Sequence, residues 1–473
     1  MAPITHSGTV EITTRIDSWK EIGVYVGRDV RTVIRWEKER GMPVHRIPGG
    51  RRNAVFALTS ELDAWLVHNE HPEESSSSEP ARTGHRQLRR LFLLFVGAAA
   101  IFVLVWAIAV RNRTSARTQT VINAPSGRSL GFTVERIPLI SVYGIAASDL
   151  NGDGIPDLVI GNFPNRTVSI LMGTGNGHFA APVMISACRG AMVPAIADFD
   201  ADGHPDIAIT CQEESSVAVL HSDGHGSFKV AQRLSVACTA YGVQAADFNG
   251  DGAVDLVVAC ESGDVSVFRN DHGTLRLAFS LRTGHEMRTA AVADFDGDGF
   301  ADIAVPFGRA TDKLSLLVLF GDRDMTFQNR QQVGAQFPQS GLGSGVMTVA
   351  DFNQDGKPDI AVANGDGTLY SVLNLGARSF AAPQMLRIGT TYSNPVVTDI
   401  DGDGLSDLVV SKPFENTVEV FFGLRGGHFS EPQPMITAEY PLVPIVADLN
   451  GDGRPDVVFS SPPADSIIVL TSM

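Results

Sequence analysis

The chain has 473 residues, which is long enough for several domains, and a formal net charge of −16. The charge is unevenly placed: residues 1–68 contain ten Lys and Arg against eight Asp and Glu, whereas residues 111–473 contain 23 against 41. The four cysteines form no cluster with histidines at the spacing of zinc ligands, which excludes a zinc finger.

The first segment, residues 12–68, has the pattern of a small helical domain. Ser18 and Glu21 form a capping box before a first short helix, and Asp29 caps a second helix. The sequence then predicts a hairpin or wing over residues 44–57 and one more helix. This arrangement is a helix-turn-helix with a wing.

This segment resembles the MerR and excisionase-like winged DNA-binding domains. The likeness is carried by Trp19-Lys20-Glu21-Ile22, Gly27-Arg28-Asp29-Val30-Arg31-Thr32-Val33, Arg35-Trp36-Glu37 and Leu62-Asp63-Ala64-Trp65-Leu66. The resemblance implies that the second helix enters the major groove of DNA. The residues that would contact bases or phosphates are Arg28, Arg31, Thr32 and Arg35, with Arg51 and Arg52 on the backbone near the wing. A three-helix domain that binds protein is the alternative, because the local excess of positive charge is small.

Two polar linkers flank an apolar segment. Residues 69–90 include Glu73-Glu74 and four serines, which cannot build a core. Residues 91–110 are twenty residues without one charge, the length needed for a helix to cross a hydrocarbon core of about 30 Å. We therefore expect one transmembrane helix in a lipid bilayer, followed by a second linker over residues 111–130.

The remaining 343 residues, 131–473, are organised by a repeated acidic loop. In residues 294–302, carboxylates stand at loop positions 1, 3, 5 and 9, and a glycine stands at position 6. A hard cation such as Ca²⁺ takes about six to eight oxygen ligands, and alternate residues of a tight loop can supply them. The loop occurs seven times, with intervals of 49, 49, 47, 57, 48 and 49 residues between its first aspartates.

Asp or Asn fills all four ligand positions in every copy. The predicted Ca²⁺ ligands, for up to seven ions, are Asp149, Asn151, Asp153 and Asp157; Asp198, Asp200, Asp202 and Asp206; Asp247, Asn249, Asp251 and Asp255; Asp294, Asp296, Asp298 and Asp302; Asp351, Asn353, Asp355 and Asp359; Asp399, Asp401, Asp403 and Asp407; Asp448, Asn450, Asp452 and Asp456. The acidity of this region comes from these loops, and we expect the ions to be structural more than regulatory.

Each period contains four short apolar segments, here named A, B, C and D. In the second copy they are residues 191–197, 205–210, 216–221 and 227–234, and the acidic loop joins A to B. Four antiparallel strands per period predict a blade of a β-propeller. Seven loops predict seven blades, so the fold class is mainly β with a small N-terminal helical domain.

The repeat resembles the FG-GAP/VCBS family, the integrin α-chain type of propeller, over residues 131–473. The acidic loops carry most of the likeness, and Leu-Phe-Gly at 319–321 and Phe-Phe-Gly at 421–423 carry part of it. The chain ends after a C strand, and residues 131–137 fit a D strand. We therefore expect the N-terminal strand to complete the last blade and close the ring.

The connections opposite the acidic loops form a candidate ligand face. The long fourth interval is caused by insertions near residues 307–313 and 331–345, which both fall on this face. Aromatic and arginine side chains on loops are typical binding anchors for a protein or glycan ligand. The candidates are Tyr143, Arg189, Tyr241, His285, Arg288, Tyr392 and Tyr440, together with Glu286. Tyrosines that only pack between blades are the alternative.

The cysteines fit the same repeat. Cys188 and Cys238 precede A strands, and Cys211 and Cys260 end B strands of the same blades. We predict hairpin disulfides Cys188–Cys211 and Cys238–Cys260, which an oxidising periplasm permits. Four buried free thiols are the alternative.

No repeat departs toward a nucleophile–base pair, so we expect no enzyme activity. One hypothesis is a single-pass regulator of the bacterial inner membrane, with a cytoplasmic DNA-binding domain, a periplasmic sensor propeller and a homodimer as the signalling state. Extracellular calcium modules work at about 10⁻⁴–10⁻³ M, which places the propeller outside the cytoplasm. The other hypothesis is an envelope adhesion or binding protein whose N-terminal domain only anchors or docks.

Overall fold

The computed structural model describes residues 118–284, 287–307, 315–333, 346–364, 367–388 and 393–473, together with short stretches between residues 15 and 65. The chain divides into two compact units, Met1–Ala100 and Ile101–Met473.

The first unit contains a small antiparallel sheet. Its strands, in the order β1-β3-β2, are β1 (Arg15–Ile16), β2 (His45–Arg46) and β3 (Val55–Leu58). The pairing of β2 with β3 agrees with the predicted wing, whereas β1 lies in a segment for which the sequence predicts no structure. The buried core of this unit is Ile22, Val33, Met42, Val55, Ala57 and Leu62, and Ile22, Val33 and Leu62 are helical. The helix-turn-helix as a whole rests on residues outside the described part.

The predicted transmembrane segment, residues 91–110, also lies outside the described residues. Among the residues that the structure does describe, no helix has the length and apolar character needed to span a bilayer.

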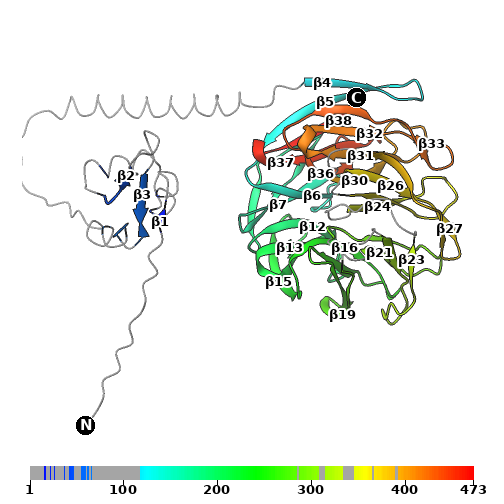
Figure 1. The fold of residues 1–473 in the computed structure, drawn as a ribbon, viewed down its shortest axis with the longest axis horizontal. Coiled ribbons are helices and arrows are strands. Elements are labelled where there is room, and N and C mark those ends of the chain that lie inside the picture. The colour runs from blue at the N-terminus through cyan, green and yellow to red at the C-terminus, as the bar shows by residue number, and fades with distance from the viewer. Residues whose placement is uncertain are drawn as a thin grey trace, which may run out of the picture. The chain divides into compact units, whose positions relative to one another are not determined.

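The second unit is a propeller of seven sheets arranged around a common axis (Figure 1). The first strands of neighbouring blades contact one another, so the A strands surround the centre and the D strands form the rim.

The first three blades are built as follows. Blade 1 contains β6 (Val142–Ser148), β7 (Asp157–Asn162), β8 (Thr167–Leu171) and β11 (Val183–Ser186), with a hairpin of β9 (Gly173–Gly175) and β10 (His178–Phe179). Blade 2 contains β12 (Ala191–Ala197), β13 (Asp206–Cys211), β14 (Ser216–Ser222) and β15 (Phe228–Ser235). Blade 3 contains β16 (Ala240–Ala246), β17 (Asp255–Cys260), β18 (Asp264–Asp271) and β19 (Thr274–Arg282).

The next three blades repeat the same order. Blade 4 contains β20 (Ala291–Ala293), β21 (Asp302–Phe307), β22 (Ser315–Leu319) and β23 (Arg330–Val333). Blade 5 contains β24 (Val346–Ala350), β25 (Asp359–Ala363), β26 (Thr368–Val372) and β29 (Gln384–Ile388), with β27 (Asn374–Gly376) and β28 (Ser379–Phe380) as a hairpin. Blade 6 contains β30 (Ser393–Thr398), β31 (Asp407–Lys412), β32 (Thr417–Phe421) and β35 (Gln433–Thr437), with β33 (Gly423–Leu424) and β34 (His428–Phe429) as a hairpin.

Blade 7 is closed by the N-terminal part of the unit, as predicted. Its strands are β36 (Leu442–Ala447), β37 (Asp456–Ser461), β38 (Ser466–Ser472), β5 (Ser129–Pro138) and β4 (Thr118–Asn123). The fourth of these, β5, pairs antiparallel with β38, which ends the chain. Three short 3-10 helices lie in B–C connections: η1 (Gln212–Glu214), η2 (Pro413–Glu415) and η3 (Pro462–Ala464).

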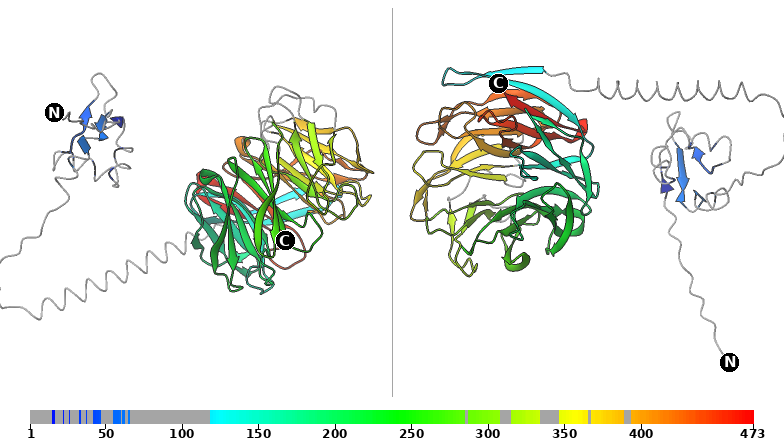
Figure 2. Two further views of the ribbon diagram at one scale, coloured as in Figure 1. Left: turned by 90° about the horizontal axis from the view of Figure 1, so that it is seen from below. Right: turned by 180° about the vertical axis from the view of Figure 1, so that it is seen from behind.

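The linker predicted over residues 111–130 is corrected by β4. This strand pairs along its whole length with β5 and gives blade 7 a fifth strand at the rim of the ring (Figures 1 and 2). The exposed side chains of Gln119, Val121 and Asn123 alternate with half-buried Thr120 and buried Ile122, a two-residue period that the composition of the segment does not reveal.

The core of the propeller lies between the blades. Seven separate buried clusters each join one blade to the next, and the seventh joins blade 7 back to blade 1. Six of the B strands are buried along their full length, for example Asp206–Cys211 and Asp456–Ser461, because both faces of each sheet pack on a neighbour. The ring therefore holds every A–B loop in a fixed place relative to its neighbours.

Candidate metal centres

All seven A–B connections fold into the same loop. The carboxylate at position 1 accepts hydrogen bonds from the backbone N–H groups of positions 5 and 6 in every blade, over 2.7–2.9 Å for position 6. The carboxylate at position 5 accepts a bond of 2.8–3.0 Å from the N–H of position 7. The loop thus closes around its own acidic side chains.

Two backbone positions in each loop are left-handed, which explains the glycines. The glycine at position 6 has φ between +79° and +92° in all seven blades. Position 4 is left-handed as well, and in two blades it is not glycine: Ala201 has φ 60° and Gln354 has φ 63°. An L-residue is strained there, so these two loops carry a local cost that glycine would remove.

The carboxylate at position 9 holds each loop onto its own blade. Its Oδ2 atom accepts the backbone N–H of loop position 2, over 2.7–3.0 Å, in all seven blades. Its Oδ1 atom accepts the backbone N–H of the residue that follows the core of the C strand, over 2.6–2.8 Å. All seven of these side chains are 0–1% exposed: Asp157, Asp206, Asp255, Asp302, Asp359, Asp407 and Asp456. A position that the sequence assigns to metal alone is therefore also a structural clamp.

Sequence reasoning missed the residue at loop position 2. It is a large apolar side chain in every blade, at most 6% exposed, and it belongs to the cluster that joins its blade to the next: Leu150, Phe199, Phe248, Phe295, Phe352, Ile400 and Leu449. The signal was available, because an apolar residue follows the first aspartate in all seven copies. This residue anchors the acidic loop in the hydrophobic core.

Carboxylates converge in the three loops that have aspartate at position 3, and at one of these loops they are joined by His221. One ligand atom from each member of a group lies within 4.8 Å of the others in four groups: Asp198, Asp200 and Asp202; Asp200, Asp206 and His221; Asp294, Asp296 and Asp302; Asp399, Asp401 and Asp407. The other four loops have asparagine at position 3, whose amide oxygen would take the place of a carboxylate. These distances fit oxygen ligands around one divalent cation.

The electrostatics of the loops favour a bound cation. Burial raises the pKa of Asp255 and Asp359 to about 6, and the pKa of Asp302 and Asp407 to about 7. The backbone donors oppose this rise, whereas the other carboxylates of each loop add to it. Ionising the buried position-9 carboxylate therefore carries a cost, which a divalent cation in the loop would offset.

The loops differ in the protein group that neutralises them. In blade 4, Arg378 from blade 5 lies 2.6 Å from Asp296 Oδ2, and its guanidinium stacks 4.3 Å from the centre of the Phe320 ring. Arg269 is 3.3 Å from Asp251 in blade 3, and Lys357 is 2.8 Å from Asp355 in blade 5.

The turn between β4 and β5 contacts the loop of blade 6. The Ser126 hydroxyl donates to Asp401 Oδ2 over 2.7 Å, and Arg128 donates to the backbone oxygens of Asp401 and Gly402. The seven loops are therefore alike in backbone but unequal in charge.

The cysteines form two disulfides, Cys188–Cys211 and Cys238–Cys260, the pairs that the sequence predicts. Each bridge joins the residues before an A strand to the end of the B strand of the same blade.

The candidate ligand face is partly packed. Tyr143 of blade 1 and Tyr241 of blade 3 meet through their hydroxyl groups, and Tyr241 is only 8% exposed. The Arg288 guanidinium lies 5.1 Å from the centre of the Tyr241 ring. Burial raises the pKa of Tyr241 above its ordinary value, so its hydroxyl stays protonated.

The other candidates are separate from this group. Arg189 pairs with Glu214 at 3.5 Å, and Tyr440 packs against the exposed ring of Phe414. His285, Glu286 and Tyr392 lie outside the described residues, as do the six DNA-contact candidates Arg28, Arg31, Thr32, Arg35, Arg51 and Arg52.

Fold and loops together define a seven-bladed β-propeller with acidic, cation-type A–B loops. The profile of the FG-GAP-like repeat family matches residues 149–209, 198–258, 247–305, 351–410 and 399–459, which together make up more than half of the chain. The chain therefore belongs to the FG-GAP-like repeat family.

Similar proteins match very different shares of the chain. Phosphatidylinositol-glycan-specific phospholipase D of Mus musculus is 32% identical over 120 residues, and the same enzyme of Rattus norvegicus is 31% identical over 112 residues. These matches cover 22% and 20% of this chain but only 14% and 13% of the enzymes, so the chain spans a small part of their length. The BP39L lectin of Burkholderia pseudomallei has a TM-score of 0.56 at 13% identity, covering 71% of this chain and 96% of the lectin. That likeness shows the fold alone.

Proposed function

We propose that this protein is a calcium-stabilised binding propeller, in which Ca²⁺ ions in the A–B loops hold a ligand-binding ring together. The observation that carries the proposal is the sevenfold repetition of one acidic loop, with a buried position-9 carboxylate in every copy. Its predicted side-chain ligands are oxygens alone, which is the donor set that Ca²⁺ prefers.

The residues present would hold the ion in a simple way. Side chains at positions 1, 3, 5 and 9, with the carbonyl of position 7, would supply its protein ligands, and the ion would supply positive charge. The loops connect neighbouring blades directly: Asn374 Nδ2 of blade 5 donates to the Phe295 carbonyl of blade 4, and Gln354 Nε2 of blade 5 donates to the Gly404 carbonyl of blade 6. An ion in one loop would therefore stabilise the contact with the next blade.

The test is thermal unfolding of the full chain with calcium and with a chelator. A site held at ten times its dissociation constant adds about 1.4 kcal/mol, so several sites add a total that shifts the midpoint by about 10 °C or more. Magnesium at the same concentration serves as the control, because its preference for a small octahedral shell fits these loops less well. An unchanged midpoint would remove the proposal.

We infer further that the chain is a membrane-anchored regulator. In this proposal residues 12–68 bind DNA in the cytoplasm, residues 91–110 cross the bacterial inner membrane, and the propeller senses an unknown protein or glycan in the periplasm. Two disulfides, which persist in oxidising compartments, support the placement of the propeller. The compact core of the first unit supports a separate N-terminal domain. The propeller binds its ligand and is not itself an enzyme.

Recovery of DNA fragments with the purified full chain tests the regulatory role. We expect enrichment of specific promoter fragments, with loss in Arg31→Ala and Arg35→Ala and retention in the matched variant Arg282→Ala, which lies in β19 of the propeller. Equal recovery with all variants, or no enrichment, would favour an envelope adhesion protein whose N-terminal domain only docks.

A further inference from the structure

The acidic loop of blade 2 differs from the other six in one residue of the neighbouring strand. In every blade one residue at the end of the C strand, or just after it, donates its backbone N–H to the position-9 Oδ1 atom, so these seven residues occupy equivalent positions. The residue just before it is Met172, His221, Arg269, Phe320, Leu373, Phe422 and Thr471 in blades 1 to 7. Only blade 2 has an imidazole at this register.

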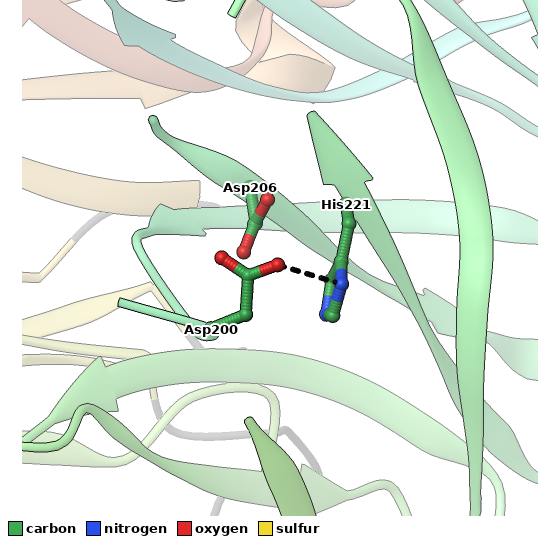
Figure 3. A group of neighbouring side chains, drawn as sticks. All are labelled: Asp200, Asp206 and His221. Atoms are coloured by element: carbon green, nitrogen blue, oxygen red, sulfur yellow. Dashed lines mark ion pairs between the residues drawn. The ribbon is translucent and has the colours of Figure 1, made fainter. Parts of the chain in front are cut away.

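The imidazole of His221 faces the loop. Its Nδ1 atom lies 2.9 Å from Asp200 Oδ2, and one ligand atom each of His221, Asp200 and Asp206 lies within 4.8 Å of the others (Figure 3). Asp206 is fully buried, and the side chains of Asp200 and His221 are about one quarter exposed. The three side chains come from the loop, the start of β13 and the end of β14, so the rigid blade fixes their spacing.

A second observation also points to a ligand. Asp200 Oδ1 is a buried oxygen that accepts no hydrogen bond from the described residues. A His–Asp ion pair accounts for Oδ2 but leaves this second oxygen unsatisfied, which is costly for a buried acceptor. In blade 4 the corresponding Asp296 is instead neutralised by an arginine, Arg378, through two donor atoms.

The donor set decides the class of ion. Ca²⁺ takes oxygen ligands, whereas an imidazole nitrogen beside carboxylates suits Zn²⁺ and related first-row dications at about 2.0–2.2 Å. We propose that the blade 2 loop binds a dication of the zinc class through His221, Asp200 and Asp206, with remaining positions open to water. The proposal uses one of the loops assigned to calcium above, and it holds or fails separately from calcium binding at the other six.

Two single substitutions replace a proposed zinc ligand of blade 2 with the residue that other blades carry at the same position. His221→Phe installs the residue that blades 4 and 6 carry at this register, and Asp200→Asn installs the residue that four sister loops carry at position 3. The matched controls are His225→Gln, an exposed histidine on the next turn of the same blade, and Asp296→Asn in blade 4. Each variant therefore uses a side chain that the fold already accepts or that solvent surrounds.

The experiment is calorimetric titration of Zn²⁺ into the full chain, with and without saturating calcium. Visible absorption of Co²⁺ is a second readout, because it reports ligation directly. We expect one Zn²⁺ site that persists in calcium, that weakens at least about tenfold in His221→Phe and Asp200→Asn, and that is unchanged in both controls.

Equal Zn²⁺ binding by wild type and both test variants would overturn the proposal, as would a wild type that takes up no Zn²⁺ in calcium. If His221→Phe fails to fold, Asp200→Asn decides the matter alone. Calcium uptake by the other six loops, counted in the same samples, separates a failure of this site from a failure of calcium binding in general.

Discussion

Blades 2 and 4 carry the same four aspartates in the same loop, yet their third aspartates have different partners. Asp200 contacts an imidazole from its own blade, whereas Asp296 contacts a guanidinium from the neighbouring blade, 82 positions along the chain. The loop backbone and the position-9 clamp are the same in both. A repeated motif therefore fixes the geometry of the loop, while residues outside the motif decide which charged group the loop contacts.

The largest expected effect comes from the clamp that the two blades share. Asp206→Ala and Asp302→Ala each leave two backbone N–H groups without an acceptor, and all of these except the half-buried N–H of Ser222 are buried. Each unsatisfied group costs about 1–3 kcal/mol, so the free energy of unfolding should fall by about 2–6 kcal/mol. Urea unfolding in chelator measures this without a metal contribution. Asp202→Ala and Asp298→Ala, exposed at position 5, are the controls and should cost less than about 1 kcal/mol. Equal losses at positions 5 and 9 would contradict the clamp.

The change of folding stability with pH should have opposite signs in the metal-free and the calcium-loaded protein. Burial raises the pKa of Asp302 to about 7, above the value of about 3.9 in the unfolded chain, so the metal-free folded state binds a proton that the unfolded state does not. Metal-free protein should therefore gain stability as pH falls from about 7.5 to about 5, whereas calcium-loaded protein should lose it as protons compete for the carboxylates. Urea midpoints across this range, with calcium or chelator, make the comparison. If the urea midpoint changes with pH in the same direction with calcium and with chelator, the prediction is wrong.

A smaller effect concerns the guanidinium of blade 4. Arg378→Gln removes a positive charge from Asp296, and a unit charge at about 5 Å is worth roughly 1–3 kcal/mol at an effective dielectric of 20–80. Calcium affinity of that loop should rise about tenfold, seen as one tighter site by calorimetry. Arg323→Gln, an exposed arginine of the same blade, should change nothing. An unchanged binding curve in Arg378→Gln would mean that Arg378 does not compete with the ion.

The smallest effect separates the two blades at loop position 4. Ala201 of blade 2 is left-handed with φ 60°, where blade 4 has Gly297 with φ 79°. Ala201→Gly should stabilise the metal-free protein by about 0.5–1 kcal/mol, and Gly297→Ala should destabilise it by a similar amount. Urea unfolding of the reciprocal pair checks both signs. Two changes of the same sign would contradict the assignment of strain.

The sequence predicts the repeated part of the molecule well. Seven loops with a recurring spacing predict seven blades, because each repeat contains the same pattern of loop and strands. The additional strand at residues 131–137 predicts the closure of blade 7. The family match rests on those same loops.

What the sequence misses depends on distant partners. Arg378 contacts Asp296, and Ser126 contacts Asp401, only because the folded ring brings distant parts of the chain together. The double role of the position-9 carboxylate also needs the register of the C strand, which spacing alone does not give. The sequence does not predict strand β4 because its mostly polar composition is that of a linker. The strand forms by pairing with the free edge of β5.

Counting calcium bound to the full chain tests the central claim most directly. Equilibrium dialysis at millimolar calcium, followed by metal analysis, should give one ion for each of the seven loops when zinc-class ions are excluded. A chain that binds no calcium under these conditions would contradict the account.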